Sequence, residues 1–188
     1  VQYGPQLLFA SFLLDSLPID NGTAISGLAA SDKAGRDAVE ELWLKLTDVP
    51  LSFDAIFSNF VSYAFTQAEG AAYLPVAWRH SPGIQVAKIP AYYTYRSDMT
   101  DLTGFLAPYS FVAIDLEEPL SPSAVIELEH MAPPNVKETS CSASSSVLWK
   151  PVSSNRIAVY AVGCNPTDKT EFVQFRLRIL DQPSLLPR

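Results

Sequence analysis

Apolar and polar residues alternate with a period of two along several short segments of this chain. The clearest alternation lies in residues 171–180, where one row of side chains is apolar and the other polar. The apolar row is Val173, Phe175, Leu177 and Ile179, and the polar row is Gln174, Arg176 and Arg178. Such a pattern predicts a β-strand with one face buried and the other exposed. Residues 157–162 are almost wholly apolar, which predicts a strand covered on both faces.

Segments of this kind predict eight main strands, and a further short strand is compatible with the pattern. The eight are residues 6–14, 39–47, 71–79, 110–116, 124–131, 147–152, 156–164 and 171–180, and the short one is 24–28. Fifteen prolines against eight glycines indicate stiff corners between them. Eight strands with long, varied connections favour an all-β fold, an eight-stranded antiparallel jelly-roll sandwich, over a hairpin-linked barrel.

One or two short helices are expected in the connections between strands. Residues 52–67 carry apolar side chains at helical spacing, and Ser52 is a candidate N-cap. The same residues also alternate passably, but we favour the helix. Residues 98–106 form the second predicted helix, which Gly104 limits in length.

Length and composition indicate one folded domain over residues 1–188. The chain is 48% apolar and 18% charged, which is enough apolar material for a large core. No run approaches the roughly 18 apolar residues of a membrane span, so no contact with a membrane is expected. A signal peptide is disfavoured because Ser11 interrupts the most apolar segment and no basic segment precedes it. Val1 in place of a methionine indicates processing, trimming or a missing arm.

The net charge argues against autonomous binding of nucleic acid. Thirteen lysines and arginines face twenty acidic residues, which leaves a formal charge of −7. The basic residues are scattered, and no cluster resembles a polybasic arm that neutralises phosphate. Weak contact inside a closed container, with other cations supplying the neutralisation, remains compatible with the composition.

The two cysteines, Cys141 and Cys164, do not make a disulfide scaffold in a chain of this length. Both lie near the ends of predicted neighbouring strands. We favour free thiols, and a single bridge between them stays open.

Candidate catalytic and metal-binding residues are few, and each has a simpler structural interpretation. His80 precedes a Ser-Pro turn, so we expect a polar residue at a strand end or subunit contact rather than a catalytic base. Glu127 and Glu129 share one face of a strand while His130 points to the other, which disfavours a metal site. No motif of a serine hydrolase, a P-loop or a dinucleotide fold occurs. The sequence therefore predicts neither an enzyme nor a cofactor.

Three further patterns also favour structural roles. Residues 115–118, Asp-Leu-Glu-Glu, predict a solvated strand end, although carboxylates that meet across a symmetric contact would sense pH. The sequon at Asn21 is interpreted as a turn. The aromatic residues favour core packing and interface anchoring over base stacking, because no basic groove accompanies them. They are Trp43, Trp78, Trp149, Tyr92, Tyr93 and Tyr95.

Residues 120–140 carry a resemblance to a known family. The run combines a proline-bounded strand with three short motifs, Leu120-Ser121-Pro122, then Val125, Leu128 and Met131, then Pro134, Val136 and Lys137. This order resembles the corresponding run in the coat proteins of the tymovirus and marafivirus group. Shorter similarities lie at residues 8–10, 41–44 with Trp43, 76–78 with Trp78, 81–82, 157–162 and 172–186.

The resemblance implies an eight-stranded jelly roll that assembles into a quasi-equivalent icosahedral shell around positive-strand RNA. The implied partners are identical subunits and, through weak contacts, genomic RNA, with polyamines or other cations as counterions. The implied location is the virion, and the host cytoplasm during assembly. The motif residues named above are expected to be packing positions, and no RNA-binding residue is assigned.

Two alternatives stay open beside this interpretation. One is a coat protein of another jelly-roll RNA virus group, cut from a polyprotein, which would explain Val1. The other is a trimeric extracellular binding module of the C1q or TNF kind. An enzyme on a β-sandwich is the least supported, since no convergent nucleophile, base or metal set is visible.

Overall fold

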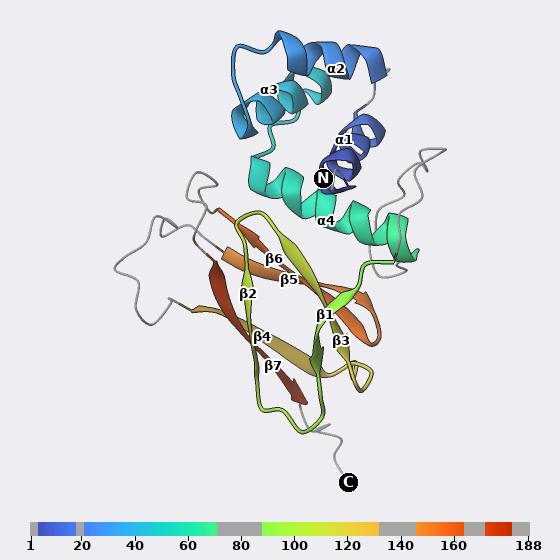
Figure 1. Ribbon diagram of the computed structural model, residues 1–188, viewed down its shortest axis with the longest axis vertical. Helices are drawn as coiled ribbons and strands as arrows, with labels where there is room; N and C mark the ends of the chain where they lie inside the picture. The colour runs from blue at the N-terminus through green and yellow to red at the C-terminus, as the bar shows by residue number, and fades with distance from the viewer. Residues whose placement is uncertain (1–3, 18–20, 71–87, 132–145, 164–171, 182–188) are drawn as a thin grey trace. The chain divides into compact units, whose positions relative to one another are not determined.

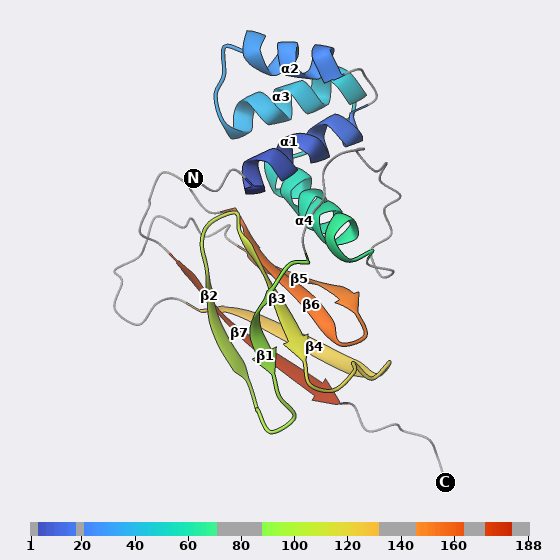
Figure 2. The same cartoon turned by 45° about the vertical axis from the view of Figure 1, so that its right-hand side comes forward.

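The computed structural model describes residues 4–17, 21–70, 88–131, 146–163 and 172–181. The chain divides into two compact units: residues 1–71 with 75–88, and residues 72–74 with 89–188. Within the described ranges, the helices belong to the first unit and the strands to the second (Figures 1 and 2). The jelly-roll prediction therefore applies only to the second unit, and the prediction of one domain over residues 1–188 stays a prediction.

The first unit contains four helices: α1 (Gly4–Ser16), α2 (Asn21–Ala30), α3 (Arg36–Thr47) and α4 (Phe53–Glu69). Helix α4 begins at Ser52, whose Oγ accepts the Ala55 N–H at 3.4 Å. It ends at Gly70, whose φ of 60° is in the left-handed region that glycine adopts without strain. The helix predicted over residues 52–67 is thus confirmed, although it follows another helix instead of connecting two strands.

An aromatic cluster holds the first unit together. Phe12 on α1 is fully buried, and its ring centroid lies 6.3 Å from Trp43, 5.7 Å from Phe60 and 5.6 Å from Tyr63. These contacts join α1 to α3 and α4. Burying an aromatic side chain of this size contributes roughly 1.5–3 kcal/mol, so the cluster accounts for much of the packing of these three helices.

The strands predicted at residues 6–14, 24–28 and 39–47 are wrong, because these segments lie in α1, α2 and α3. In α3 the buried positions are Ala38, Val39, Leu42 and Trp43, while Leu44 is 48% exposed. Buried positions three and four residues apart follow the helical period, not the period of two. Residues 6–14 are apolar at nearly every position, so their pattern does not discriminate a buried strand from a buried helix.

The second unit consists of two sheets. The four-stranded sheet has the order β1 (Ala91–Tyr95), β3 (Phe111–Leu116), β6 (Arg156–Val162) and β5 (Ser146–Ser153). The three-stranded sheet has the order β2 (Leu102–Leu106), β7 (Val173–Asp181) and β4 (Ala124–Met131). Neighbouring strands are antiparallel except β1 and β3, which run parallel.

One hydrophobic core lies between the two sheets. The three-stranded sheet contributes Leu102, Leu106, Val173, Phe175 and Leu177, and the four-stranded sheet contributes Tyr95, Ile114, Leu116, Ile157, Val159 and Ala161. Two mostly antiparallel sheets that share a core are compatible with a β-sandwich. Every residue of β6 is buried, as its continuous apolar run predicts.

Five predicted strands are confirmed within a few residues of their ends: 110–116 as β3, 124–131 as β4, 147–152 as β5, 156–164 as β6 and 171–180 as β7. The strand predicted at 71–79 lies outside the described residues. Strand β1 was not predicted. The described part of the chain thus contains seven strands, and an all-β fold is wrong for the first unit.

The helix predicted at residues 98–106 is also wrong, because β2 occupies residues Leu102–Leu106. Leu102, Gly104 and Leu106 face the core while Thr103 and Phe105 face outward. A Cβ at position 104 would lie 2.5 Å from the ring of Phe175, so Gly104 allows β2 to approach β7. The glycine that was expected to limit a helix instead permits close strand packing.

Candidate functional site

The side of the three-stranded sheet that faces away from the core carries an ordered set of charges. We call it the charged face. It consists of Thr103 and Phe105 on β2, Gln174, Arg176, Arg178 and Leu180 on β7, and Val125, Glu127, Glu129 and Met131 on β4. Period-two alternation determines this set, because alternate residues of the same strands, such as Leu128 and Leu177, belong to the core between the sheets.

Strand pairing places opposite charges beside each other on this face. In the antiparallel register of β4 and β7, Glu129 lies opposite Arg176 and Glu127 lies opposite Arg178. Strand β7 therefore presents a basic row and β4 an acidic row. Cross-strand pairs of opposite charge stabilise a sheet by roughly 0.2–1 kcal/mol each.

The charges on this face are only loosely neutralised. Arg176 Nη1 lies 3.6 Å from Glu129 Oε2, and Arg176 Nε lies 3.7 Å from Asp101 Oδ2, just ahead of β2. Arg178 Nη2 lies 3.9 Å from the same Asp101 oxygen. Charge-assisted hydrogen bonds are closer, at about 2.7–2.9 Å, and Arg176 Nε is buried without a hydrogen-bond partner. Glu127 has no ion-pair partner among the described residues.

Exposed apolar side chains flank the charged centre. Leu180 and Val125 lie opposite each other in the register and are 43% and 40% exposed. At the other end of the face, Phe105 is 53% exposed and lies opposite Gln174. The face therefore combines matched charges at its centre with exposed apolar side chains at its margins.

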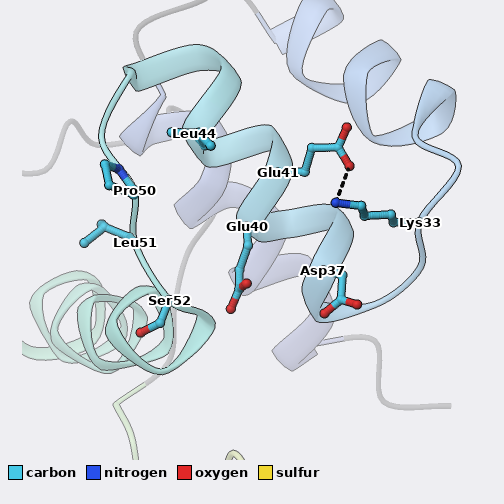
Figure 3. A pocket seen from close by; sticks show the side chains of 8 residues that line it. All are labelled: Lys33, Asp37, Glu40, Glu41, Leu44, Pro50, Leu51 and Ser52. Carbon is cyan, nitrogen blue, oxygen red and sulfur yellow. Dashed lines mark ion pairs between the residues drawn. The ribbon is translucent and has the colours of Figure 1, made fainter.

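The first unit contains a separate acidic pocket of about 450 Å³ between α3 and the segment leading into α4 (Figure 3). Two of its three carboxylates have local partners: Glu41 Oε2 lies 3.3 Å from Lys33 Nζ, and Glu40 Oε1 accepts the Phe53 N–H at 2.5 Å. The third is Asp37, in the first turn of α3, where a negative charge complements the helix dipole. These carboxylates are accounted for by helix stabilisation, so we assign the pocket no chemistry.

The motif residues of the tymovirus-like run at residues 120–137 lie in different environments, some packed against the core and others exposed. Leu120 and Leu128 are half-buried and pack against the sandwich core, whereas Pro122 is exposed and Val125 belongs to the charged face. The Ser121 hydroxyl lies 2.9 Å from that of Ser123 in the turn ahead of β4. Met131 is the last residue of β4, and Trp43 is buried in the first unit. The remaining motif positions lie outside the described residues: Pro134, Val136, Lys137 and Trp78.

The titratable residues considered from the sequence are not brought together. His130 is exposed and lies opposite Phe175 on β7, and His80, Cys141 and Cys164 lie outside the described residues. Within the ranges that the structure describes, no three His, Cys, Asp or Glu side chains form a group able to hold a metal. No described helix is long and apolar enough to cross a membrane.

Asp115 has a more specific role than a solvated strand end. Its Oδ1 accepts the N–H of Arg156 Nε at 2.6 Å, and Arg156 is only 5% exposed. Two residues on, Glu117 accepts hydrogen bonds from the backbone N–H and the hydroxyl of Ser97. The acidic run therefore anchors two parts of the second unit.

Sequence reasoning missed the charged face as a site. It identified Arg176 and Arg178 as an outward row and Glu127 with Glu129 as another, but it did not place these rows side by side. Asp101 was not singled out at all. The only local signal was the matched alternation of residues 124–131 and 171–180, which is compatible with any register between them.

Comparisons with known proteins identify no relative of this chain. No family model matches the chain, and no curated protein or solved structure matches it either. The function is therefore argued from the strand topology and from the charged face.

Proposed function

We propose that this chain is a structural, non-catalytic coat protein that self-assembles into an icosahedral shell around positive-strand RNA. The observation that carries the proposal is the order of the strands in the second unit. The resemblance of residues 120–137 to tymovirus and marafivirus coat proteins supports it independently.

The order of six of the seven described strands in the second unit supports a jelly-roll topology. In an eight-stranded jelly roll, one sheet holds the second, seventh, fourth and fifth strands and the other holds the first, eighth, third and sixth. The three-stranded sheet here has the order β2-β7-β4, and the other sheet contains β1, β3 and β6 in that order. These six strands agree with the jelly-roll order if its fifth and eighth strands are left out.

The parallel pairing of β1 and β3 supports the same topology. In a jelly roll the first and third strands are each antiparallel to the eighth strand between them, so they run in the same direction. Here β1 and β3 pair directly and in parallel, with Thr94 opposite Asp115 and Tyr95 opposite Leu116. Direct parallel pairing within an otherwise antiparallel sheet is what that arrangement would give if no strand lay between β1 and β3, and none does among the described residues.

One strand departs from the pattern. In a jelly roll the fifth strand pairs with the fourth, whereas β5 pairs with β6, with Val147 opposite Ala161. The two strands form a hairpin through Ser154 and Asn155. The proposal therefore describes a jelly-roll variant in which the fifth strand extends the sheet of the sixth.

The proposed contact with RNA is weak and depends on counterions. The charged face carries Arg176 and Arg178, but the carboxylates of Asp101, Glu127 and Glu129 accompany them. With a formal charge of −7 on the whole chain, phosphate neutralisation in a filled shell falls to polyamines or other cations.

Particle formation tests the proposal directly. The purified chain is examined by size exclusion with light scattering and by negative-stain microscopy, over a range of concentrations and from mildly acidic to neutral pH. We expect uniform spherical particles that protect RNA from nuclease. A sharp monomer at every concentration would overturn the proposal, and a sharp trimer would favour the extracellular binding module instead.

A further inference from the structure

We propose that the charged face binds the charged face of a second copy of this chain, about a two-fold axis that runs parallel to the strands. This inference rests on the proposed self-assembly and specifies one of its contacts. The two charge rows and their shared register carry the argument, since they make the face complementary to itself.

The geometry of the contact follows from the positions of β4 and β7. The two-fold axis lies above the charged face, midway between β4 and β7 and parallel to both strands. Rotation about it places β7 of one copy over β4 of the other. Heights along the strands are preserved by this rotation, so residues that are register partners within one copy face each other across the contact. Arg176 then faces Glu129 of the second copy, and Arg178 faces Glu127.

Because the ion pairs within one copy are loose, the arginines and glutamates of the charged face are available to pair with those of a second copy. The ion pairs of Arg176 and Arg178 span 3.6–3.9 Å, beyond the length of a charge-assisted hydrogen bond. A second copy would supply Glu127, which has no ion-pair partner in the described part of its own chain, to Arg178. Each copy gains the same contacts, as an isologous interface requires.

The apolar end of the face formed by Leu180 and Val125 fits the same operation. Leu180 and Val125 are register partners, so Leu180 of one copy faces Val125 of the other. Both side chains are at least 40% exposed in the single chain, and the contact would remove them from water. Exposed apolar side chains beside matched charges favour a protein partner over nucleic acid, for which the three carboxylates would be repulsive.

The size of the face predicts a weak contact. The two strands that face each other across the contact, β4 and β7, are spaced about 4.8 Å apart. With about eight residues rising about 3.4 Å each, they cover on the order of 250 Å² per copy. A stable dimer interface buries about 800 Å² per partner. The contact is therefore expected to be weak alone and to become strong only when it is repeated in a closed assembly.

A pair of complementary variants tests the contact. Glu127→Arg with Glu129→Arg makes the face wholly basic on β4 and β7, and Arg176→Glu with Arg178→Glu makes it wholly acidic. Each variant alone opposes like charges, so we expect its self-association to weaken by about tenfold or more. Mixed in equal amounts, the two variants should recover association, because every facing pair is again one arginine and one glutamate.

Two control variants match these changes in net charge away from the face. Glu41→Arg with Glu118→Arg carries the same added positive charge, and Lys33→Glu with Arg96→Glu carries the same added negative charge. All four side chains are exposed or form exposed ion pairs, so these variants should associate like the parent chain. Association is measured by sedimentation velocity and light scattering, and folding is checked by circular dichroism and thermal melting.

The outcomes separate this inference from the proposed function. If the parent chain assembles and the mixture of charge variants associates no better than either alone, the charged face is not the contact, and the coat function stands. If the parent chain stays monomeric throughout, both proposals fail. Should a charge variant not fold, Val125→Ser with Leu180→Ser offers the second test. It keeps every charge and is expected to weaken association because it removes the apolar end of the contact.

Discussion

Arg156 and Asp115 form the closest ion pair of the second unit's described residues, with Arg156 Nε 2.6 Å from Asp115 Oδ1. They are register partners on β6 and β3. Arg156 Nη1 also donates to the backbone carbonyl of Ile89 at 2.9 Å, just ahead of β1. A single buried guanidinium thus connects three strands of the four-stranded sheet, including the parallel β1–β3 pair.

Removing the carboxylate from this pair should destabilise the fold. Asp115→Asn removes the charged acceptor of the buried Arg156 Nε, which costs about 1–3 kcal/mol. The value stays below that of a fully enclosed pair because the Asp115 side chain is 44% exposed. Urea unfolding measures the loss. The double variant Asp115→Asn with Arg156→Met should be more stable than Asp115→Asn alone, and the opposite order would contradict the assigned pair.

The close approach of β2 to β7 predicts a steric conflict at position 104. A Cβ there would lie 2.5 Å from Phe175 Cζ and 2.8 Å from Tyr93 Cζ. Gly104→Ala should therefore lower the free energy of unfolding by about 1–3 kcal/mol. Combining it with Phe175→Leu should give a smaller loss than the sum of the two single variants. Strict additivity in this double-mutant cycle would show that the two positions do not touch.

A buried hydrogen-bond chain connects α1 and α4 in the first unit. The Tyr63 hydroxyl donates to Asp15 Oδ2 at 2.7 Å and lies 2.9 Å from the Ser11 hydroxyl, which donates to it. Tyr63→Phe removes both bonds, so we expect a loss of about 1–2 kcal/mol in thermal or urea unfolding. Tyr92→Phe is the matched control, because Tyr92 is 75% exposed, and it should change stability little.

Lys150 predicts a pH dependence of stability. Desolvation by burial lowers the pKa of this ammonium group below its ordinary 10.5. Tyr160, whose ring centroid lies 5.6 Å from Lys150 Nζ, favours the charged form only in part. Between the lowered pKa and 10.5 the unfolded chain binds more protons than the folded chain, so the free energy of unfolding rises with pH across that window.

Lys150→Met should remove this contribution. Urea unfolding at a series of pH values approaching 10.5 is compared between the parent chain and the variant. We expect the parent chain to gain stability toward the top of the series relative to Lys150→Met. A constant difference between the two chains would contradict a lowered pKa for this side chain.

Local periodicity of apolar residues was sufficient to predict the type of element where the pattern was strong. Residues 126–129 and 173–179 alternate between apolar and polar side chains, and each segment lies in a strand with its apolar row in the core. Residues 52–67 repeat at the helical period behind an N-cap, and they became α4. In each of these segments the spacing of apolar residues agrees with only one kind of element.

Periodicity failed where apolar residues were too dense or too sparse. Residues 6–14 are apolar at almost every position, so strand and helix bury them equally well, and contacts such as that between Phe12 and Tyr63 decide for the helix. In β2 the short Leu102–Leu106 segment has its strand character set by packing against β7. Tertiary context overrides local preference in both cases.

The sequence by itself determined which side chains share a face of a strand, because alternate residues of an extended chain point to opposite sides. It thus defined the basic row at Arg176 and Arg178 and the acidic row at Glu127 and Glu129. Only the tertiary structure decided that these rows are neighbours and that Arg176 lies opposite Glu129. The reason is physical: strand register is set by hydrogen bonds and core packing between segments far apart in the chain, which no local pattern specifies.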